Sequence, residues 1–187
     1  MNSEWKQPDV LIYISSFGKE SSKSHDLLRK AAARYTRRDK CDWNIALGAK
    51  GKPYFSAAPR VHFSITHSGG YWMCAFSSRE VGLDLQVHRT CSREKLSQRF
   101  FHPKEDAFLR LRDYADFFDL WAAKESYVKY TGCGIARGFN DFSTVASDGK
   151  FPSVQGARLR LIPWREGYSL CLCARQLEDV SLAWLRE

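Results

Sequence analysis

The stretch that decides the fold reads WAAKESYVK and occupies residues 121–129. Its surroundings predict one long amphipathic helix over residues 114–130, which ends at Gly132 and Gly134. Glu125 and Lys129 stand four residues apart, so they project from one face of that helix. The carboxylate could hold a metal ion and the lysine a phosphate, although an ordinary surface ion pair has the same spacing.

A second acidic position lies some forty residues earlier, within the apolar segment VGLDLQV of residues 81–87. The segment predicts a strand, on which Asp84 and Gln86 share one face. Gly82 would let another backbone or a ligand approach that strand closely. Oxygen side chains are the ligands that Mg2+ prefers, so Asp84 could bind a cation; a strand acid paired with a nearby arginine is the alternative.

The rest of the chain predicts helices mixed with short strands. The expected helices cover residues 25–38 and 92–101, and another begins at residues 103–104. Expected strands cover residues 10–14, 61–66, 71–76, 142–146, 157–162, 168–174 and 180–184. Residues 50–53 indicate a turn, and Pro53 argues against a central strand there.

Two similar halves follow from the spacing of these turns. Gly51-Lys52 precedes Gly70-Tyr71 much as Gly149-Lys150 precedes Gly167-Tyr168, which favours an internal duplication over a coincidence of turn glycines. We therefore predict an α+β fold of two halves, each a helix plus a small antiparallel sheet, related by a pseudo-twofold axis. The expected halves are residues 1–88 and 89–187.

Composition limits the class of protein and its partners. The chain has 187 residues, 44% of them hydrophobic, as in a compact globular protein. A formal charge of +8 favours an anionic partner: nucleic acid, a phosphorylated ligand or an acidic protein. The six cysteines form no CxxC pair and are expected to be reduced. Neither a signal peptide nor a membrane span is predicted, so we expect a cytoplasmic protein.

Taken in order, these segments resemble the Sfp-type 4′-phosphopantetheinyl transferase superfamily. The family's Gly-x-Asp segment is matched by residues 82–84, and its Trp-x-x-Lys-Glu-Ser/Ala-x-x-Lys helix by residues 121–129. Its Gly-Lys-Pro and Ser/Thr-His-Ser-Gly segments are matched by residues 51–53 and 66–69. The resemblance implies the 4′-phosphopantetheinyl transferase fold and transfer of the phosphopantetheine arm of coenzyme A to a serine of an apo acyl or peptidyl carrier protein, with release of 3′,5′-adenosine bisphosphate.

The resemblance also implies a magnesium site. Asp84 and Glu125 would bind Mg2+ beside the pyrophosphate of coenzyme A, and Glu125, directly or through a water molecule, would take the proton of the carrier serine. Lys124 and Lys129 would neutralise charge on the pyrophosphate and the leaving group. Many bacterial members carry Asp-x-Glu where this chain has Asp84-Leu85-Gln86. We therefore expect water, or the amide oxygen of Gln86, in place of that carboxylate, with lower metal affinity.

The nucleotide end of coenzyme A is implied to lie in the first half. Thr66 and His67, with a basic residue of the first helix, would hold the 3′-phosphate, and Lys52 with Pro53 would border the adenine. Arg34 is chosen on that helix by charge alone, and Arg29 or Arg38 remain alternatives.

The expected partner explains the basic charge, because carrier proteins are typically acidic and would be attracted at long range. The family acts as a monomer, and neither nucleic acid nor a membrane is an expected partner. A non-catalytic binding protein for nucleic acid is the rival interpretation, but it leaves Asp84 and Glu125 without a role.

Overall fold

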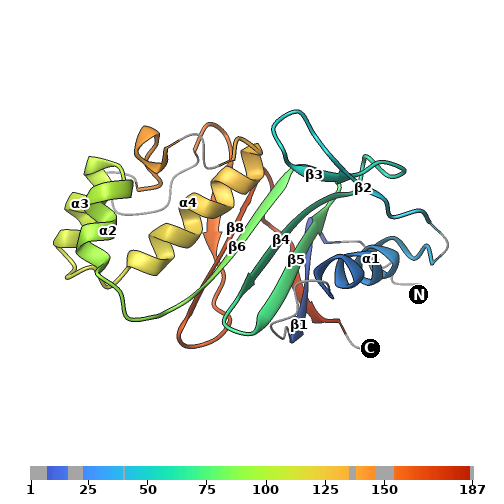
Figure 1. The fold of residues 1–187 in the computed structure, drawn as a ribbon, viewed down its shortest axis with the longest axis horizontal. Helices are drawn as coiled ribbons and strands as arrows, with labels where there is room; N and C mark the ends of the chain where they lie inside the picture. Colours follow the sequence, from blue (N-terminus) through green and yellow to red (C-terminus); the bar gives the residue numbers. More distant parts are fainter. Residues whose placement is uncertain (1–7, 17–22, 40, 135–137, 146–153, 186–187) are drawn as a thin grey trace.

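The computed structural model describes residues 8–16, 23–39, 41–134, 138–145 and 154–185 (Figure 1). Its helices are α1 (Lys23–Thr36), α2 (Arg93–Phe100), α3 (Pro103–Arg110), α4 (Phe117–Thr131) and the short 3-10 helix η1 (Phe139–Asp141). Its strands are β1 (Val10–Ser16), β2 (Ile45–Leu47), β3 (Pro53–Phe55), β4 (His62–Ser68), β5 (Tyr71–Ser77), β6 (Val81–Val87), β7 (Arg158–Leu161), β8 (Tyr168–Ala174) and β9 (Val180–Trp184).

Two sheets carry most of the strands. The first has the order β4-β5-β1-β9 and the second the order β6-β8-β7, while β2 and β3 form a separate hairpin. Helix α1 lies against the first sheet and α4 against the second, with α2 and α3 at the far end of the molecule (Figure 1). This arrangement confirms the prediction of a mixed α+β fold.

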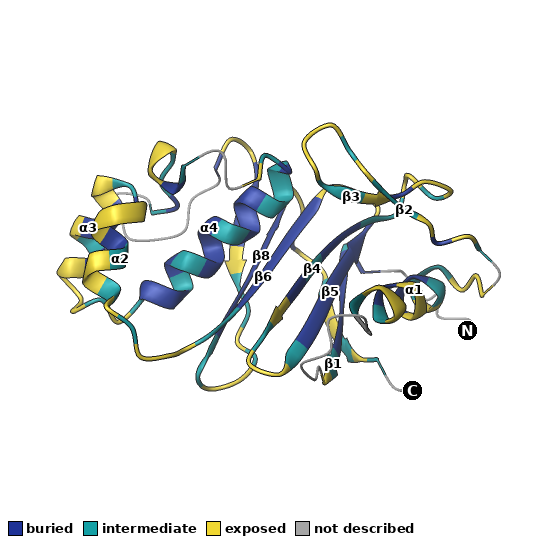
Figure 2. Cartoon of the chain, in the orientation of Figure 1, coloured by how far each residue is buried: buried dark blue, intermediate teal, exposed yellow. Residues whose placement is uncertain are grey.

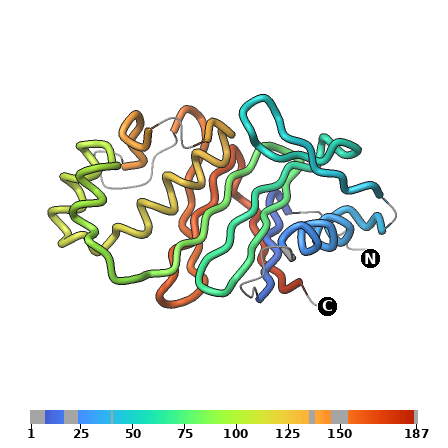
Figure 3. Tube along the Cα trace, viewed as in Figure 1, coloured from blue at the N-terminus to red at the C-terminus, as the bar shows by residue number. Residues whose placement is uncertain are grey.

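Strand exchange links the predicted halves. β6 comes from the first range but pairs with β8 in the second sheet, whereas β9 comes from the second range and pairs with β1. The blue and red strands therefore run side by side in Figure 3. The β1–β9 pair is parallel, so the expectation of purely antiparallel sheets is wrong. The orders β4-β5-β1 and β7-β8-β6 match, while the twofold axis and the division at residue 88 stay predictions.

A seam of side-chain hydroxyls joins the two sheets. β4 and β6 run side by side and parallel, but β4 offers hydroxyl groups to the amides of β6 where a sheet would use carbonyl groups. The three bonds are Leu83 N to Ser64 Oγ (2.9 Å), Leu85 N to Thr66 Oγ1 (3.0 Å) and Val87 N to Ser68 Oγ (3.0 Å). They satisfy buried amide donors that would otherwise lack a partner, and Figure 2 shows the buried strands on either side of the seam.

The apolar core has three main layers. One cluster fills the space between α1 and the first sheet, and a second lies between the two sheets. A third packs α4 onto the outer face of the second sheet, where Cys171 and Cys173 are buried. The alternation of strand side chains between two faces explains this layering. All six cysteines are free in the structure, and their reduced state stays a prediction.

One expected strand does not form among the described residues. Residues 142–145 of the strand expected over residues 142–146 form no strand, so that prediction is wrong for these four residues. The side chain of Glu105 binds Thr144 and holds this segment out of any sheet. Pro53 does begin a strand, but in the separate hairpin, where its missing amide costs no central ladder bond. Ala146, Gly149 and Lys150 lie outside the described residues.

No helix in the described ranges is both long and apolar enough to cross a bilayer. The cytoplasmic location stays a prediction.

Candidate active site

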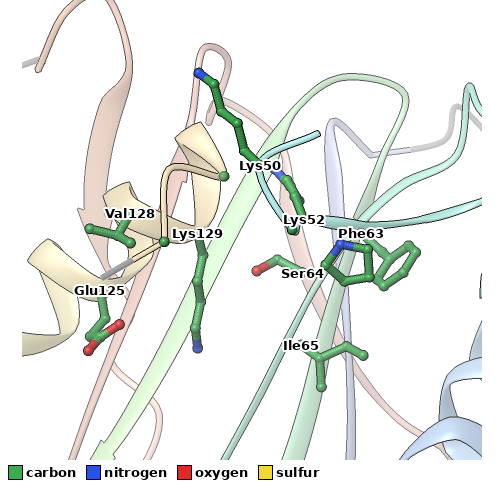
Figure 4. A pocket seen from close by; sticks show the side chains of 12 residues that line it. Lys50, Lys52, Phe63, Ser64, Ile65, Glu125, Val128 and Lys129 are labelled. Atoms are coloured by element: carbon green, nitrogen blue, oxygen red, sulfur yellow. The ribbon is translucent and has the colours of Figure 1, made fainter. Parts of the chain in front are cut away.

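A pocket of about 330 Å³ opens between β4 and the C-terminal half of α4 (Figure 4). Three segments line it: the turn before β3, the middle of β4, and α4 with the glycines that follow it. The lining residues are Lys50, Gly51, Lys52, Pro53, Phe63, Ser64, Ile65, Glu125, Val128, Lys129, Gly132 and Gly134. Polar groups of both predicted halves therefore meet around one concave space.

Asp84 is the buried centre of the polar cluster beside this pocket. Its residue exposure is only 3%, yet three side chains reach its carboxylate. Lys129 Nζ lies 2.6 Å from Oδ1, Thr66 Oγ1 donates to Oδ1 at 3.3 Å, and Gln86 Nε2 donates to Oδ2 at 2.7 Å. A buried carboxylate needs such partners, because desolvation disfavours its charged form.

Glu125 lies near enough to Asp84 to be affected by its charge. Burial raises the pKa of the Glu125 carboxyl above its ordinary value, the charge of Asp84 raises it further, and Lys129 opposes both. In Figure 4 the side chains of Glu125 and Lys129 leave α4 in the same direction. Two carboxylates and one ammonium group thus share a small, partly desolvated volume.

Gly82 explains how α4 comes so close to β6. A Cβ atom built on this glycine would lie 2.0 Å from the carbonyl oxygen of Ser126 and 2.5 Å from the amide nitrogen of Tyr130. Only glycine lets the helix backbone rest on the strand here. The close approach brings Asp84 under the turn of α4 that carries Glu125 and Lys129.

The donor set at this point fits a magnesium ion. Asp84 and Glu125 supply hard carboxylate oxygens, and Mg2+ is usually held by one or two carboxylates with water completing its shell. Burial raises the pKa of Glu125 and the charge of Asp84 raises it further, and a divalent cation would favour the charged form of both carboxylates. The Gln86 amide nitrogen donates to Asp84 in this structure, and water or the Gln86 oxygen as a metal ligand stays a prediction.

Lys124 lies elsewhere, which corrects its expected place at the pyrophosphate. Its side chain is fully buried, and Nζ binds Glu105 Oε2 and the Phe142 carbonyl oxygen, each at 2.7 Å. The ammonium group also lies 4.1 Å from the centre of the Phe142 ring. Position 124 is one residue from Glu125, so its side chain leaves the helix about 100° away from the pocket. Lys124 is therefore a structural residue that ties α4 to α3.

Lys52 and Pro53 line the pocket as expected. The Lys52 ammonium group is occupied by protein: Nζ binds Glu80 Oε2 at 2.5 Å and the carbonyl oxygens of Val81 and Tyr130 at 3.1 and 2.9 Å. The aliphatic stem of Lys52 passes close to Gly132, where an added Cβ atom would lie 3.0 Å from the Lys52 Cβ.

Thr66 and His67 occupy opposite faces of β4, because neighbouring strand residues alternate. Thr66 is buried at the seam, whereas His67 is exposed on the face that carries Ile65 of the pocket wall. Ser64, on the same face as Thr66, and Ile65, on the same face as His67, both line the pocket, and a joint contact of Thr66 and His67 with one phosphate stays a prediction. Arg34 is exposed on α1, with its guanidinium 6.0 Å from the centre of the Tyr13 ring. Its joint role with His67 stays a prediction.

Sequence reasoning missed two groups that build the site. Ser64 and Ser68 act with Thr66 in the seam, and their alternation with apolar residues in the sequence HFSITHS was the available signal. Glu105, the buried partner of Lys124, had no such signal, because the two residues are 19 positions apart and meet only through helix packing.

Fold and geometry together define an α+β protein whose site, with its metal-type carboxylates and nearby ammonium group, suits phosphoryl transfer. Residues 80–183 match the profile of the 4′-phosphopantetheinyl transferase superfamily. The chain is 31% identical to a 4′-phosphopantetheinyl transferase of Bacillus subtilis, over 79% of this chain and 70% of that protein. It is 30% identical to the 4′-phosphopantetheinyl transferase Sfp of Bacillus subtilis (strain 168), over 86% of this chain and 77% of that protein.

A third relative, the 4′-phosphopantetheinyl transferase HetI of Nostoc, is 39% identical over 48% of this chain and 41% of its own length. The chain belongs to the 4′-phosphopantetheinyl transferase superfamily.

Proposed function

We propose that this protein moves the phosphopantetheine arm of coenzyme A onto a serine of an apo acyl or peptidyl carrier protein in a Mg2+-dependent reaction. The observation that carries the proposal is the meeting of Asp84, Glu125 and Lys129 at the pocket between β4 and α4. Family membership supplies the type of reaction, and this cluster supplies groups that such a reaction requires.

Glu125 is the proposed general base. Glu125 is half-buried and lines the pocket, where a serine hydroxyl can reach its carboxylate directly or through a water molecule. The serine oxygen attacks the β-phosphorus of coenzyme A as Glu125 takes its proton. The bond from that phosphorus to the bridging oxygen breaks, and 3′,5′-adenosine bisphosphate leaves.

Lys129 and Asp84 control charge during this step. Mg2+, held by Asp84 and Glu125, would supply neutralisation of the pyrophosphate. Lys129 has 31% of its side chain exposed, so its ammonium group can turn from Asp84 toward phosphate oxygens as negative charge grows on the leaving group. Thr66 and Gln86 keep the Asp84 carboxylate in place through its two oxygens.

The adenine would lie against Pro53 and the stem of Lys52. His67, on the face of β4 that continues the pocket wall, is the proposed ligand of the 3′-phosphate. Arg34 remains the proposed basic partner on α1. The basic chain would attract an acidic carrier protein. One copy of the chain contains all the proposed site residues, so we propose that the protein acts as a monomer.

The test is the intact mass of an apo carrier protein incubated with this protein, coenzyme A and Mg2+. We expect a gain of one phosphopantetheine, lost with EDTA and with Glu125→Ala. Glu178→Ala is the matched control, because this exposed glutamate contacts Arg158 and the Leu177 amide, does not line the pocket, and should leave the gain intact. No gain with several carriers, despite measurable coenzyme A binding, would contradict the proposal.

A further inference from the structure

Tyr168 at the start of β8 reaches across to the turn between β4 and β5. Its hydroxyl donates a 2.6 Å hydrogen bond to the Gly69 carbonyl oxygen, although the two residues are 99 positions apart. A Cβ atom built on Gly69 would lie 2.3 Å from the Tyr168 hydroxyl and 2.7 Å from its ring. The tyrosine therefore rests directly on the backbone of the turn.

The turn itself has a conformation that glycine permits. Gly69 and Gly70 have φ values of +56° and +85°, which are typical of a tight two-residue hairpin turn. Ser68 and Tyr71, on either side, still pair in the β4–β5 ladder. A displacement of this turn would thus be passed on to the last residues of β4.

Two contacts from the second sheet hold the end of β4. Ser68 accepts the amide of Val87, and Val87 is the ladder partner of Tyr168 on β8. Ser68, Val87, Tyr168 and Gly69 therefore form a closed ring of contacts. His67 lies between the seam residue Thr66 and these four contacting residues, so the His67 backbone has little freedom to move.

Aromatic neighbours fix the ring of Tyr168. Trp164 packs against it edge to face with 5.3 Å between ring centres, and Tyr71 does so at 5.7 Å. The hydroxyl group is consequently held in one direction and does not follow the turn passively.

We propose that Tyr168 is a positioning residue for nucleotide binding: it fixes the turn beside His67 and thereby sets how well the enzyme holds the 3′-phosphate of coenzyme A. The proposal rests on the proposed function, in which His67 contacts that phosphate. Tyr168 itself touches no reacting atom in this scheme. Its contribution should appear in binding of the 3′-phosphate and not in the transfer step.

Steady-state kinetics of Tyr168→Phe with coenzyme A and with coenzyme A lacking its 3′-phosphate test this role. Phenylalanine keeps the ring and removes only the hydrogen bond. Because such a bond contributes modestly, we expect KM for coenzyme A to rise about three- to tenfold, with kcat within about twofold. KM for the compound without the 3′-phosphate should stay within about twofold.

Tyr114→Phe is the matched control, since the Tyr114 hydroxyl donates a long 3.4 Å bond to Asp106 at a distance from the turn. Urea unfolding of both variants would show whether they remain folded. Suppose that the wild-type enzyme prefers coenzyme A. If Tyr168→Phe then raises KM equally for both compounds, or for neither, the positioning role is refuted while the proposed function stands. If the wild-type enzyme has no activity, both proposals fail. Activity without a preference for the 3′-phosphate refutes the positioning role and leaves the proposed transfer standing.

Discussion

Lys124→Met should lower the free energy of unfolding by roughly 3–5 kcal/mol, the usual cost of removing one partner of a buried ion pair. Lys124 and Glu105 both have fully buried side chains, 2.7 Å apart. Methionine fills most of the space of the lysine stem but leaves the Glu105 carboxylate without its cation. The bonds from His102 N and from Thr144 to that carboxylate remain, so the lower end of this range is the expectation.

Urea unfolding measures this loss as a lower midpoint with an unchanged slope. In a chain of this length the loss corresponds to a melting temperature lower by roughly 6–12 °C. Adding Glu105→Gln to Lys124→Met should restore at least about 1 kcal/mol, because the unpaired charge is removed. Lys104→Met, at an exposed lysine, is the control and should cost under about 0.5 kcal/mol.

Kinetics separate this structural role from a role in binding. At a temperature where Lys124→Met stays folded, KM for coenzyme A should remain within about twofold of the wild-type value. A variant with normal stability and a much higher KM would refute the reasoning and return Lys124 to the pyrophosphate.

Two further predictions concern the carboxylates and the helix contact. In EDTA, Glu125→Gln should stabilise the protein at pH 7 by up to about 1 kcal/mol, since the raised pKa means that folding disfavours the charged form of this partly buried group. The gain should shrink as the pH falls through the raised pKa of the folded state, and it should be nearly gone below about 4.5, where the unfolded chain is protonated too. Unfolding at pH 7 and pH 4 measures the gain, and an equal gain at both pH values would contradict the prediction. Gly82→Ala should cost about 3 kcal/mol and most of the transferase activity, because its methyl group would overlap the Ser126 carbonyl. Thermal unfolding beside Gly48→Ala, whose methyl group would meet only an ordinary contact, checks this, and equal melting temperatures would refute it.

Much of the fold could be predicted because its elements follow hydrophobic periodicity. The strands at residues 71–77, 81–87 and 168–174 and the long helix lie within a few residues of their expected bounds. The β1–β9 pairing could not be predicted, because nothing local in either strand specifies a parallel partner about 170 residues away.

The candidate site was predictable where spacing along one element decides geometry. Glu125 and Lys129 share a helix face, and Asp84 lies beside Lys129. Spacing failed for Lys124, because a motif gives the order of side chains and not the direction in which each leaves the helix.

The hydroxyl seam between β4 and β6 has a consequence for how such an enzyme can change over evolutionary time. Main-chain hydrogen bonds between strands do not depend on the side chains, so most substitutions leave them in place. Here each bond depends on a serine or threonine, and one codon change can delete it. Three single substitutions, one at each hydroxyl residue, could therefore change the spacing between the strand that carries Asp84 and the strand that carries His67. Selection for a substrate of another size could act on each substitution separately.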